Sequence, residues 1–369
     1  MHIFGIILTL TVTIMHAYVF WRAGSVPVIR DLIPAKALIL AAIIIWAVLF
    51  LGVIYGHHGT GILATALNFI AMNWMAVLFL VFISLLAVDA ITCFGFLFPR
   101  IAPRLRGAAI IVGGVLSVIA LVQGMRAPIV SNYEINISKL PQQMENTTIV
   151  ALADLHLKSP SQKRWLMDRI DQVQLLQPDL IVLLGDIFEG HGMPHKDLLA
   201  ATNRLSAPLG VWAVLGNHES YGGLDKNKVP VEGAGFAWLR NKWVEIRPGF
   251  ILAGVDDLSV NRRSGKGDDL IKKALHNRPL GATILLSHSP LKIEKAADAG
   301  VDLMLCAHTH GGQIWPFGYL VKRVYPYFEG LYKKKDMTVI VSRGTGTWGP
   351  RMRLWHPGEI LHIRLHRKK

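Results

Sequence analysis

The sequence predicts an α/β domain that follows four membrane-spanning helices. Three observations support this fold class. The first third of the chain is almost uniformly apolar, the remainder alternates strand-like and helix-like runs, and five of the strand-like runs end in aspartate, asparagine or histidine. With 52% hydrophobic and only 17% charged residues, the chain is too apolar for an ordinary soluble protein and too polar for membrane helices alone.

Charge is distributed unevenly along the 369 residues. Residues 1–125 hold only six of the 39 Lys and Arg residues and two of the 25 Asp and Glu residues. The basic remainder is long enough to bury a core of its own. The two cysteines, Cys93 and Cys306, indicate neither a disulfide framework nor a zinc motif.

Residues 1–125 are expected to form four transmembrane helices. A helix needs about 20 apolar residues to cross the hydrocarbon core of a bilayer, and these segments lack the polar face of a soluble helix. The first segment has neither the basic start nor the cleavage site of a signal peptide, so we expect it to stay attached. The predicted segments are residues 3–20, 37–55, 69–96 and 108–125.

The short loops predict how these helices are oriented. Arg22, Arg30 and Lys36 flank or lie in the first loop, and the third loop, FPRIAPRLRG, holds three arginines, whereas the second loop holds no Lys or Arg. Basic loops stay in the cytoplasm. We therefore expect an integral protein of the cell or inner membrane whose globular domain is extracytoplasmic.

Asp89 is the only acidic residue inside the four segments. A carboxyl group at membrane depth is a candidate functional site, but residues 69–96 are long enough for Asp89 to lie at the headgroup level instead. Residues 126–146 contain Pro128 and Pro141 and are expected to form a linker, which places the globular domain at residues 147–369.

Polar side chains follow the apolar strands of the globular domain. The strand-like runs end in D-x-H, G-D, G-N-H-E, S-H and H-x-H. A spacing of two places both side chains of an extended segment on the same face, and the carboxyl ends of strands in an α/β sheet gather at one edge. The residues expected to converge there are Asp154, His156, Asp186, Asn217, His218, His288, His308 and His310.

This ligand set predicts a metal centre. Carboxylate, imidazole and amide groups suit Mn, Fe, Zn or Ni ions. Five imidazoles and two aspartates are too many ligands for one ion, but they suit two divalent metal ions. A two-metal site activates a bridging water and stabilises both oxygens of a phosphoryl displacement, so the sequence predicts hydrolysis of a phosphate ester.

The same motifs resemble the calcineurin-like metallophosphoesterase family in order and spacing over residues 147–365. The blocks GDIFEG, AHTHGGQIWP and SRGTGTWGPRMRLWHPGEI look most like its membrane-linked phosphodiesterase branch, whose N-terminal part consists of transmembrane helices. The resemblance implies a four-layer α/β/β/α sandwich with a dinuclear site at the sheet edge. Ala307 stands where the family usually has glycine, and a negative φ would tolerate it.

The resemblance also implies a role for each motif residue. His218 corresponds to the family's catalytic histidine, which protonates the leaving oxygen or stabilises the phosphoryl charge. The implied reaction is attack by a metal-bridging hydroxide on a phosphoester, phosphodiester or pyrophosphate bond. One metal is expected on Asp154, His156 and His310, the other on Asn217, His288 and His308, with Asp186 bridging the two.

Several other residues have two open interpretations. Glu189 and Glu219 are candidates to orient the imidazoles, and Asp256 with Asp257 forms either a turn, a cap or a further supporting pair. Candidates for contact with a phosphate or the substrate, each of which could equally belong to a solvated loop, are His191, His195, Arg262, Arg263, Lys266 and Arg343.

Residues 320–369 carry twelve Lys and Arg residues against three acids. They form either a solvated basic face or a surface that docks on anionic headgroups. The expected partners are the lipid bilayer and a phosphorylated lipid or lipid-linked substrate, without nucleic acid, and the oligomeric state stays open. Aromatic residues that either line a cleft for an acyl or isoprenoid chain or pack in the core are Trp315, Tyr319, Tyr325, Tyr327 and Phe328.

Two other functional classes compete with a hydrolase. A non-catalytic membrane sensor or scaffold can retain a metallophosphoesterase fold. However, a site that no longer catalyses a reaction typically loses ligands, and the predicted metal-ligand set of this chain is complete. A transporter with a regulatory domain would need more charged residues in its spans than Asp89 alone.

Overall fold

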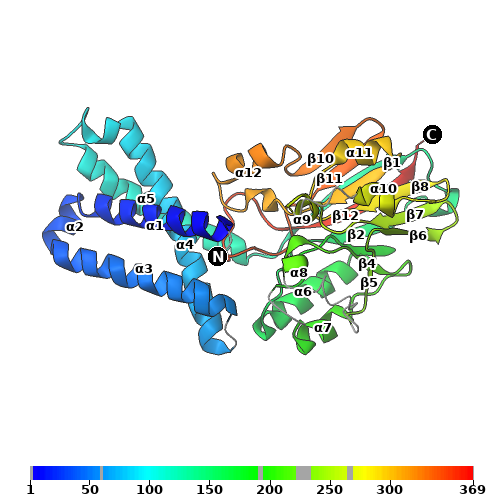
Figure 1. Cartoon of the computed structure of the whole chain (residues 1–369), viewed down its shortest axis with the longest axis horizontal. Coiled ribbons are helices and arrows are strands. Elements are labelled where there is room, and N and C mark those ends of the chain that lie inside the picture. The colour runs from blue at the N-terminus through cyan, green and yellow to red at the C-terminus, as the bar shows by residue number, and fades with distance from the viewer. Residues whose placement is uncertain (1–2, 59–60, 190–193, 222–233, 264–268, 369) are drawn as a thin grey trace. The chain divides into compact units, whose positions relative to one another are not determined.

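The computed structural model describes residues 3–58, 61–189, 194–221, 234–263 and 269–368 (Figure 1). The chain divides into two compact units. The helical unit comprises Met1–Met125 and Gly349–Leu354, and the globular unit comprises Arg126–Trp348 and Trp355–Lys369.

The helical unit confirms the four apolar segments. Four of its helices are long and apolar enough to cross a membrane, and at most 33% of any spanning window is buried. Most of their side chains therefore face outward, as lipid contact requires. The elements of this unit are α1 (Ile3–Ala23), α2 (Pro27–Leu32), α3 (Ala35–His58), α4 (Ile62–Ile91), η1 (Cys93–Gly95) and α5 (Ala102–Met125).

Two glycines bring α3 close to α4. A Cβ atom on Gly52 would lie 2.6 Å from the carbonyl oxygen of Leu67, and one on Gly56 would lie 2.6 Å from Cβ of Asn68. Small residues four apart let membrane helices approach at backbone distance, where packing rather than hydrophobic burial holds them together.

Asp89 lies in a buried ion cluster at one end of the helical unit. Its carboxylate pairs with Nε of Arg22 at 2.6 Å and with Arg106 at 2.8 Å, and it accepts a hydrogen bond from the Tyr18 hydroxyl. Asp89 itself is fully buried. The cluster joins the C-terminal ends of α1 and α4 to the start of α5, so Asp89 stabilises the helical bundle by neutralising two arginines.

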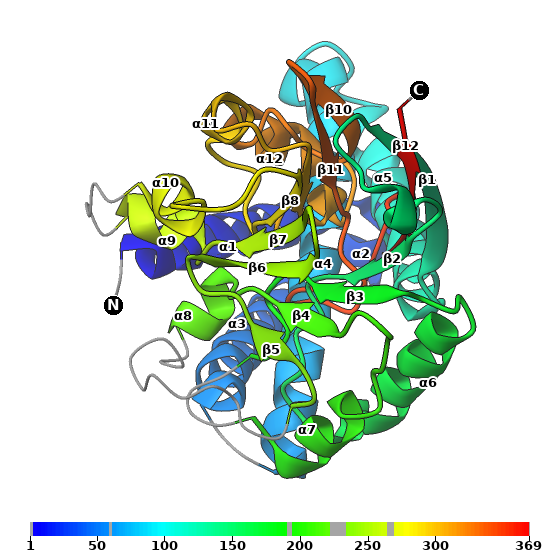
Figure 2. The ribbon, with the colours of Figure 1, turned by 90° about the vertical axis from the view of Figure 1, so that its right-hand side faces the viewer.

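The globular unit contains two six-stranded mixed sheets (Figure 2). One has the order β1-β12-β2-β3-β4-β5 and the other the order β10-β11-β9-β8-β7-β6. The strands are β1 (Ile129–Ile137), β2 (Thr148–Leu152), β3 (Leu180–Leu183), β4 (Val211–Ala213), β5 (Ala237–Trp238), β6 (Lys242–Arg247), β7 (Phe250–Gly254), β8 (Ala282–Leu286), β9 (Leu303–Cys306), β10 (Gly330–Lys334), β11 (Met337–Val341) and β12 (Glu359–Arg367).

The layers follow from the burial of alternate strand faces. One apolar cluster fills the space between the two sheets, a second joins the first sheet to α6 and α7, and a third joins the second sheet to α10 and α11. The order helix, sheet, sheet, helix confirms the predicted four-layer sandwich. Its helices are η2 (Gln142–Met144), η3 (Pro160–Gln162), α6 (Lys163–Gln174), α7 (Lys196–Thr202), α8 (Asn217–Tyr221), α9 (Leu258–Arg263), α10 (Leu270–Ala274), α11 (Ile293–Asp298), η4 (His310–Gly312) and α12 (Gly318–Val324).

The predicted domain boundaries need two corrections. Residues 126–146, expected as a linker, contain β1, which pairs in parallel with β12 over its whole length. Tyr133, Ile135 and Ile137 alternate with polar residues and pack in the core between the sheets. Residues 349–354, expected in the globular domain, belong to the helical unit, where the Arg353 amide bonds to the carbonyl of Ala120.

Candidate metal centre

The predicted ligands come from both sheets. Those at the ends of β2, β3 and β4 belong to the first sheet, and those at the ends of β8 and β9 belong to the second. Because β2, β3 and β4 are parallel to one another, as are β8 and β9, each sheet brings its ligands to one edge. The structure thus brings together all eight predicted side chains, although from two packed sheets rather than from one.

One group of ligand atoms surrounds Asp154. Nε2 of His156 lies 3.1 Å from Nε2 of His310, and Nε2 of His310 lies 3.4 Å from Oδ1 of Asp154. Among the described residues, no donor forms a hydrogen bond with this buried Oδ1. Two facing ring nitrogens and an unbonded carboxylate oxygen are the arrangement that a cation would hold together.

A second group surrounds Nε2 of His288. This atom lies 3.1 Å from Oδ2 of Asp186, 3.1 Å from Nδ1 of His308 and 3.2 Å from Oδ1 of Asn217. The same Oδ2 of Asp186 is 3.9 Å from Nε2 of His156 in the first group. Asp186 therefore lies between the two groups, where its predicted bridging role requires it to be.

Partners on the far side of the imidazoles hold them in position. His156 presents Nδ1 to Glu189 at 3.1 Å, and His288 presents Nδ1 to the carbonyl of Leu184 at 2.8 Å. Nε2 of His308 meets the hydroxyl of Tyr325 at 2.9 Å. Such partners fix the ring orientation and tautomer and leave the inner nitrogens free to bind a metal.

Tyr325 is a site residue that sequence reasoning placed elsewhere. We expected it either in an aromatic cleft for a lipid chain or in the core, but the side chain is buried and directed at His308. Phe328 is buried too, so neither residue lines an exposed lip. No local pattern marks Tyr325, because its contact with His308 spans 17 residues and a helix.

His218 lies beside the first group. Its amide donates to Oδ1 of Asp186 at 2.8 Å, its Nδ1 lies 3.3 Å from Glu189, and its ring is 6.0 Å from the ring of Trp348. Burial lowers the pKa of His218 despite the nearby carboxylates. The side chain remains 21% exposed, so a substrate can reach it.

Glu219 is a candidate to orient an imidazole in the sequence, but in the structure it binds backbone amides instead. Its buried carboxylate accepts four hydrogen bonds, from the amides of Gly216, Asp186, Ile187 and Phe188 at 2.6–2.9 Å. The loops after β3 and β4, which carry Asp186 and Asn217, are thereby fastened to each other.

The spacing of D-x-H and H-x-H predicts extended segments, but the turns that carry these residues are not extended. Asp154, His156, Asp186, His308 and His310 all have φ between 48° and 74°. Non-glycine residues adopt such angles rarely, and they concentrate at functional sites where the surrounding structure imposes them. Left-handed turns, rather than strand alternation, direct these side chains inward.

Ala307 fits its position, since its φ is not in the left-handed region. The residue is fully buried, and its amide donates to the carbonyl of His288. The methyl group therefore adds no backbone strain where the related family commonly has glycine.

The electrostatics of the site favour bound cations. Burial raises the pKa of Asp154 to about 6, whereas at Asp186 the positive charge of His288 outweighs burial and holds the pKa well below its usual value. Burial alone would lower the pKa of His156, but the Glu189 hydrogen bond and charge raise it to about 9. Buried carboxylates and imidazoles this close require positive charge among them, and the donor set fits two divalent ions.

The other candidates lie outside this cluster or point away from it. Arg343 pairs with the buried Glu359 at 2.8 Å, and Asp256 pairs with Arg240 at 2.9 Å. Asp257 accepts hydrogen bonds from the hydroxyls of Ser259 and Ser289. The exposed His195 caps α7. His191, Lys266 and the side chains of Arg262 and Arg263 lie outside the described residues.

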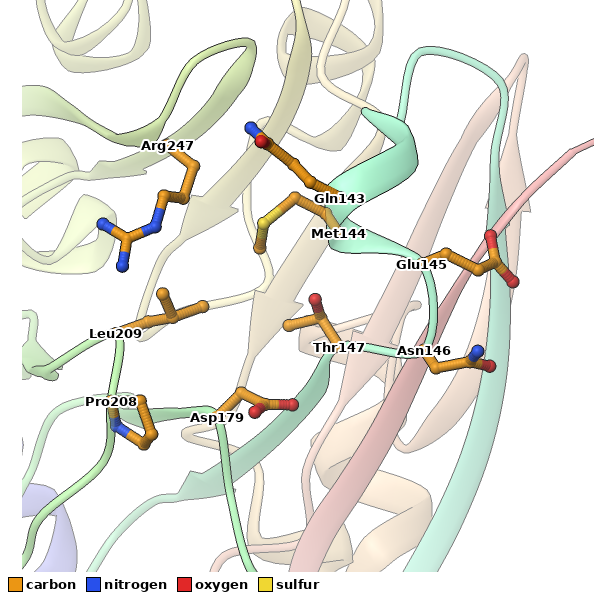
Figure 3. A pocket seen from close by; sticks show the side chains of 9 residues that line it. All are labelled: Gln143, Met144, Glu145, Asn146, Thr147, Asp179, Pro208, Leu209 and Arg247. Carbon is orange, nitrogen blue, oxygen red and sulfur yellow. The ribbon is translucent and has the colours of Figure 1, made fainter.

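The pocket shown in Figure 3, with a volume of about 260 Å³, is not part of the site. Thr147, Asp179 and Leu209 line it, and these residues precede β2, β3 and β4. The pocket therefore lies at the N-terminal ends of the strands, opposite the edge that gathers the metal ligands.

Comparisons with known proteins find similar proteins for this chain. The family model described as calcineurin-like phosphoesterase matches residues 147–312. A transmembrane protein with metallophosphoesterase domain from Bos taurus is 33% identical over 277 residues, which cover 69% of this chain and 61% of that protein. An uncharacterized metallophosphoesterase from Aquifex aeolicus is 37% identical over 252 residues, which cover 65% of this chain and 92% of that protein.

The chain thus spans less than two thirds of the bovine relative's length. Among solved structures, a dimetal phosphatase from Danio rerio is similar with a TM-score of 0.34 and 14% identity, over 55% of this chain and 88% of that one.

Proposed function

Because the chain belongs to the calcineurin-like metallophosphoesterase family, we propose that it is a metal-dependent phosphohydrolase anchored in a membrane. We propose further that it cleaves a phosphoester, phosphodiester or pyrophosphate bond of a lipid or lipid-linked substrate. The observation that carries the proposal is the convergence of two groups of metal-ligating atoms on either side of Asp186, beside a partly exposed histidine.

The ligand assignment follows the two groups of atoms. Two divalent ions held there would supply an activated water nucleophile and neutralise charge on the phosphoryl oxygens. Asn217 contributes its amide oxygen beside His288. The first ion would be held by Asp154, His156 and His310, the second by Asn217, His288 and His308, and both by Asp186.

His218 is the residue that we propose to act on the leaving group. Its ring contacts the Glu189 carboxylate on one side and is partly open on the other. Burial lowers the pKa of His218, and the Asp186 and Glu189 carboxylates oppose this effect, so they stabilise the protonated ring that donates its proton to the departing oxygen. Glu189 also contacts His156, so one carboxylate orients both a metal ligand and the acid.

The membrane part of the proposal rests on the helical unit. Four helices are long and apolar enough to cross a membrane, and the bovine relative is named as a transmembrane protein. We propose that the first and third loops face the cytoplasm, since they carry the basic residues, and that the globular unit is extracytoplasmic. An enzyme held at a bilayer acts most readily on a substrate in that bilayer, which supports a lipid or lipid-linked phosphate.

A substrate screen tests the proposal. The full-length protein, reconstituted in nanodiscs with Mn²⁺, is assayed by ³¹P NMR against lipid phosphates, lipid pyrophosphates and nucleotide-linked lipids, with a water-soluble aryl phosphodiester as the reference. We expect turnover of at least one lipid class. Hydrolysis of the soluble ester alone would refute the lipid substrate but not the phosphohydrolase.

Substitution of the acid tests the mechanism. His218→Ala should lower kcat by about 10²–10⁴-fold while the metal content per chain stays the same, because His218 is not among the proposed ligands. Wild-type turnover by this variant would show that the assigned role is wrong. Less than one metal ion per wild-type chain, with no hydrolysis of any ester, would support the non-catalytic scaffold instead.

A further inference from the structure

Exposed apolar side chains of the globular unit concentrate in one segment of the sequence. Among its described residues, ten large apolar side chains are exposed, and seven of these lie between residues 317 and 355. Phe317, Tyr319, Leu320 and Val324 are exposed by 45%, 68%, 56% and 56%. Phe317, Leu320 and Val324 are spaced three and four apart and so share a helix face. Clustered exposure of this kind marks an interaction site.

Two cations lie among these apolar residues. Lys322 and Arg323 are exposed, and no described residue forms an ion pair with either. Two lysines of the neighbouring hairpin differ, because Lys334 pairs with Glu294 and Lys335 with Asp298. We name as the α12 surface the six residues Phe317, Tyr319, Leu320, Lys322, Arg323 and Val324.

Exposed tryptophans contact residues 313–315, which precede α12 in the chain. Trp355 is 53% exposed and packs on Trp315 with ring centroids 4.9 Å apart. Trp348 is 44% exposed and exchanges two hydrogen bonds with Gln313 through its backbone. Tryptophan is enriched where a bilayer meets water, because its ring is apolar and its N–H needs a polar partner.

The α12 surface is joined rigidly to the metal centre. A Cβ atom on Gly312 would lie 2.2 Å from Cα of Gly318, so the first turn of α12 packs backbone to backbone on the turn that follows His310. Gly312 also has a φ of 71°, which favours glycine. Whatever binds α12 is therefore held next to the ligands of the site.

We propose that the α12 surface docks on an anionic lipid bilayer, with its apolar side chains in the interfacial layer and Lys322 and Arg323 on the headgroup phosphates. An amphipathic helix with apolar and basic residues binds such an interface, and the helices of the same chain place a bilayer within reach. The inference goes beyond the proposed function, because docking requires no particular substrate. Its consequence is that the metal centre faces the headgroup layer.

Depth-dependent fluorescence quenching tests the docking. The full-length Cys93→Ser protein is the background, since Cys93 is exposed and Cys306 is buried with a raised thiol pKa that prevents labelling. Leu320→Cys is labelled with the environment-sensitive dye NBD and reconstituted in nanodiscs that contain 30% phosphatidylglycerol. We expect blue-shifted emission and at least twofold quenching by doxyl-labelled lipid.

Leu280→Cys is the matched control site. Leu280 is 98% exposed and precedes β8, so it lies at the strand ends opposite the metal centre. Its label should emit as in water and resist quenching by the doxyl lipid. The proposal is wrong if residue 320 behaves like residue 280, or if its emission is blue-shifted without lipid quenching, which would indicate that protein covers α12.

Removal of the two charges tests the headgroup contact. In the Leu320→Cys background, Lys322→Ala with Arg323→Ala should lower the ratio of docked to free α12 roughly 30-fold in anionic nanodiscs, since each basic residue near the surface contributes about fivefold. In pure phosphatidylcholine the substitutions should have no effect. An equal effect in both lipids would refute headgroup binding. Hydrolysis of the soluble ester should be the same for all of these variants, so the docking test can fail without the proposed function failing.

Discussion

Glu219→Gln should destabilise the globular unit although the side chain keeps its size. The carboxylate uses both oxygens, Oε1 for the amides of Ile187 and Phe188 and Oε2 for those of Asp186 and Gly216. Glutamine replaces one oxygen with an NH₂ group, which cannot accept, so two buried amides lose their partner. At about 1–3 kcal/mol for each unsatisfied group, the expected loss is about 2–6 kcal/mol.

The assay is denaturant unfolding of the full-length protein in detergent, with metal content measured on the same samples. Glu294→Gln is the control, because Glu294 is exposed and forms a surface pair with Lys334, which should change stability by less than about 1 kcal/mol. We also expect Glu219→Gln to bind metal more weakly, since Asp186 and Asn217 lie on the loops that it fastens. Equal unfolding midpoints for the two variants would refute the reasoning.

Two further predictions concern the membrane cluster and the metal centre. Asp89→Asn should destabilise the helical unit by about 3–5 kcal/mol, because it leaves two buried arginines without a carboxylate, and thermal unfolding should show no comparable loss for the exposed Asp31→Asn. If the two substitutions shift unfolding equally, the ion cluster around Asp89 does not stabilise the bundle. Mn²⁺ binding at pH 7 should release about two protons per chain, one from His156 and one from His288. Without metal, the pKa of His156 is about 9. At His288 the charge of Asp186 outweighs burial and raises the pKa well above its ordinary value. Affinity should therefore rise with pH up to about 9, and a titration in weakly buffered indicator that detects no proton release would contradict the assigned charge states.

The elements that sequence reasoning located correctly are those with a strong local pattern. The strands that precede the predicted metal ligands lie within a few residues of their predicted positions, and all four apolar segments are found, although α4 begins seven residues and α5 six residues before the predicted start. Pro128 and Pro141, which flank β1, predict a linker there, although Tyr133, Ile135 and Ile137 alternate with polar residues as in a strand. Its partner β12 is more than 220 residues away, and the pairing is not visible from either segment alone.

The amino-acid sequence by itself determined the order and chemistry of the predicted metal ligands and the presence of a long apolar region, because both depend on residue types at short spacing. Only the tertiary structure decided that the ligands come from two packed sheets, that left-handed turns aim them inward, and that Glu189, Glu219 and Tyr325 support them. It also decided that Asp89 is neutralised by Arg22 and Arg106. The physical reason is that these outcomes rest on contacts between distant parts of the chain, and such contacts form only when the whole core is packed.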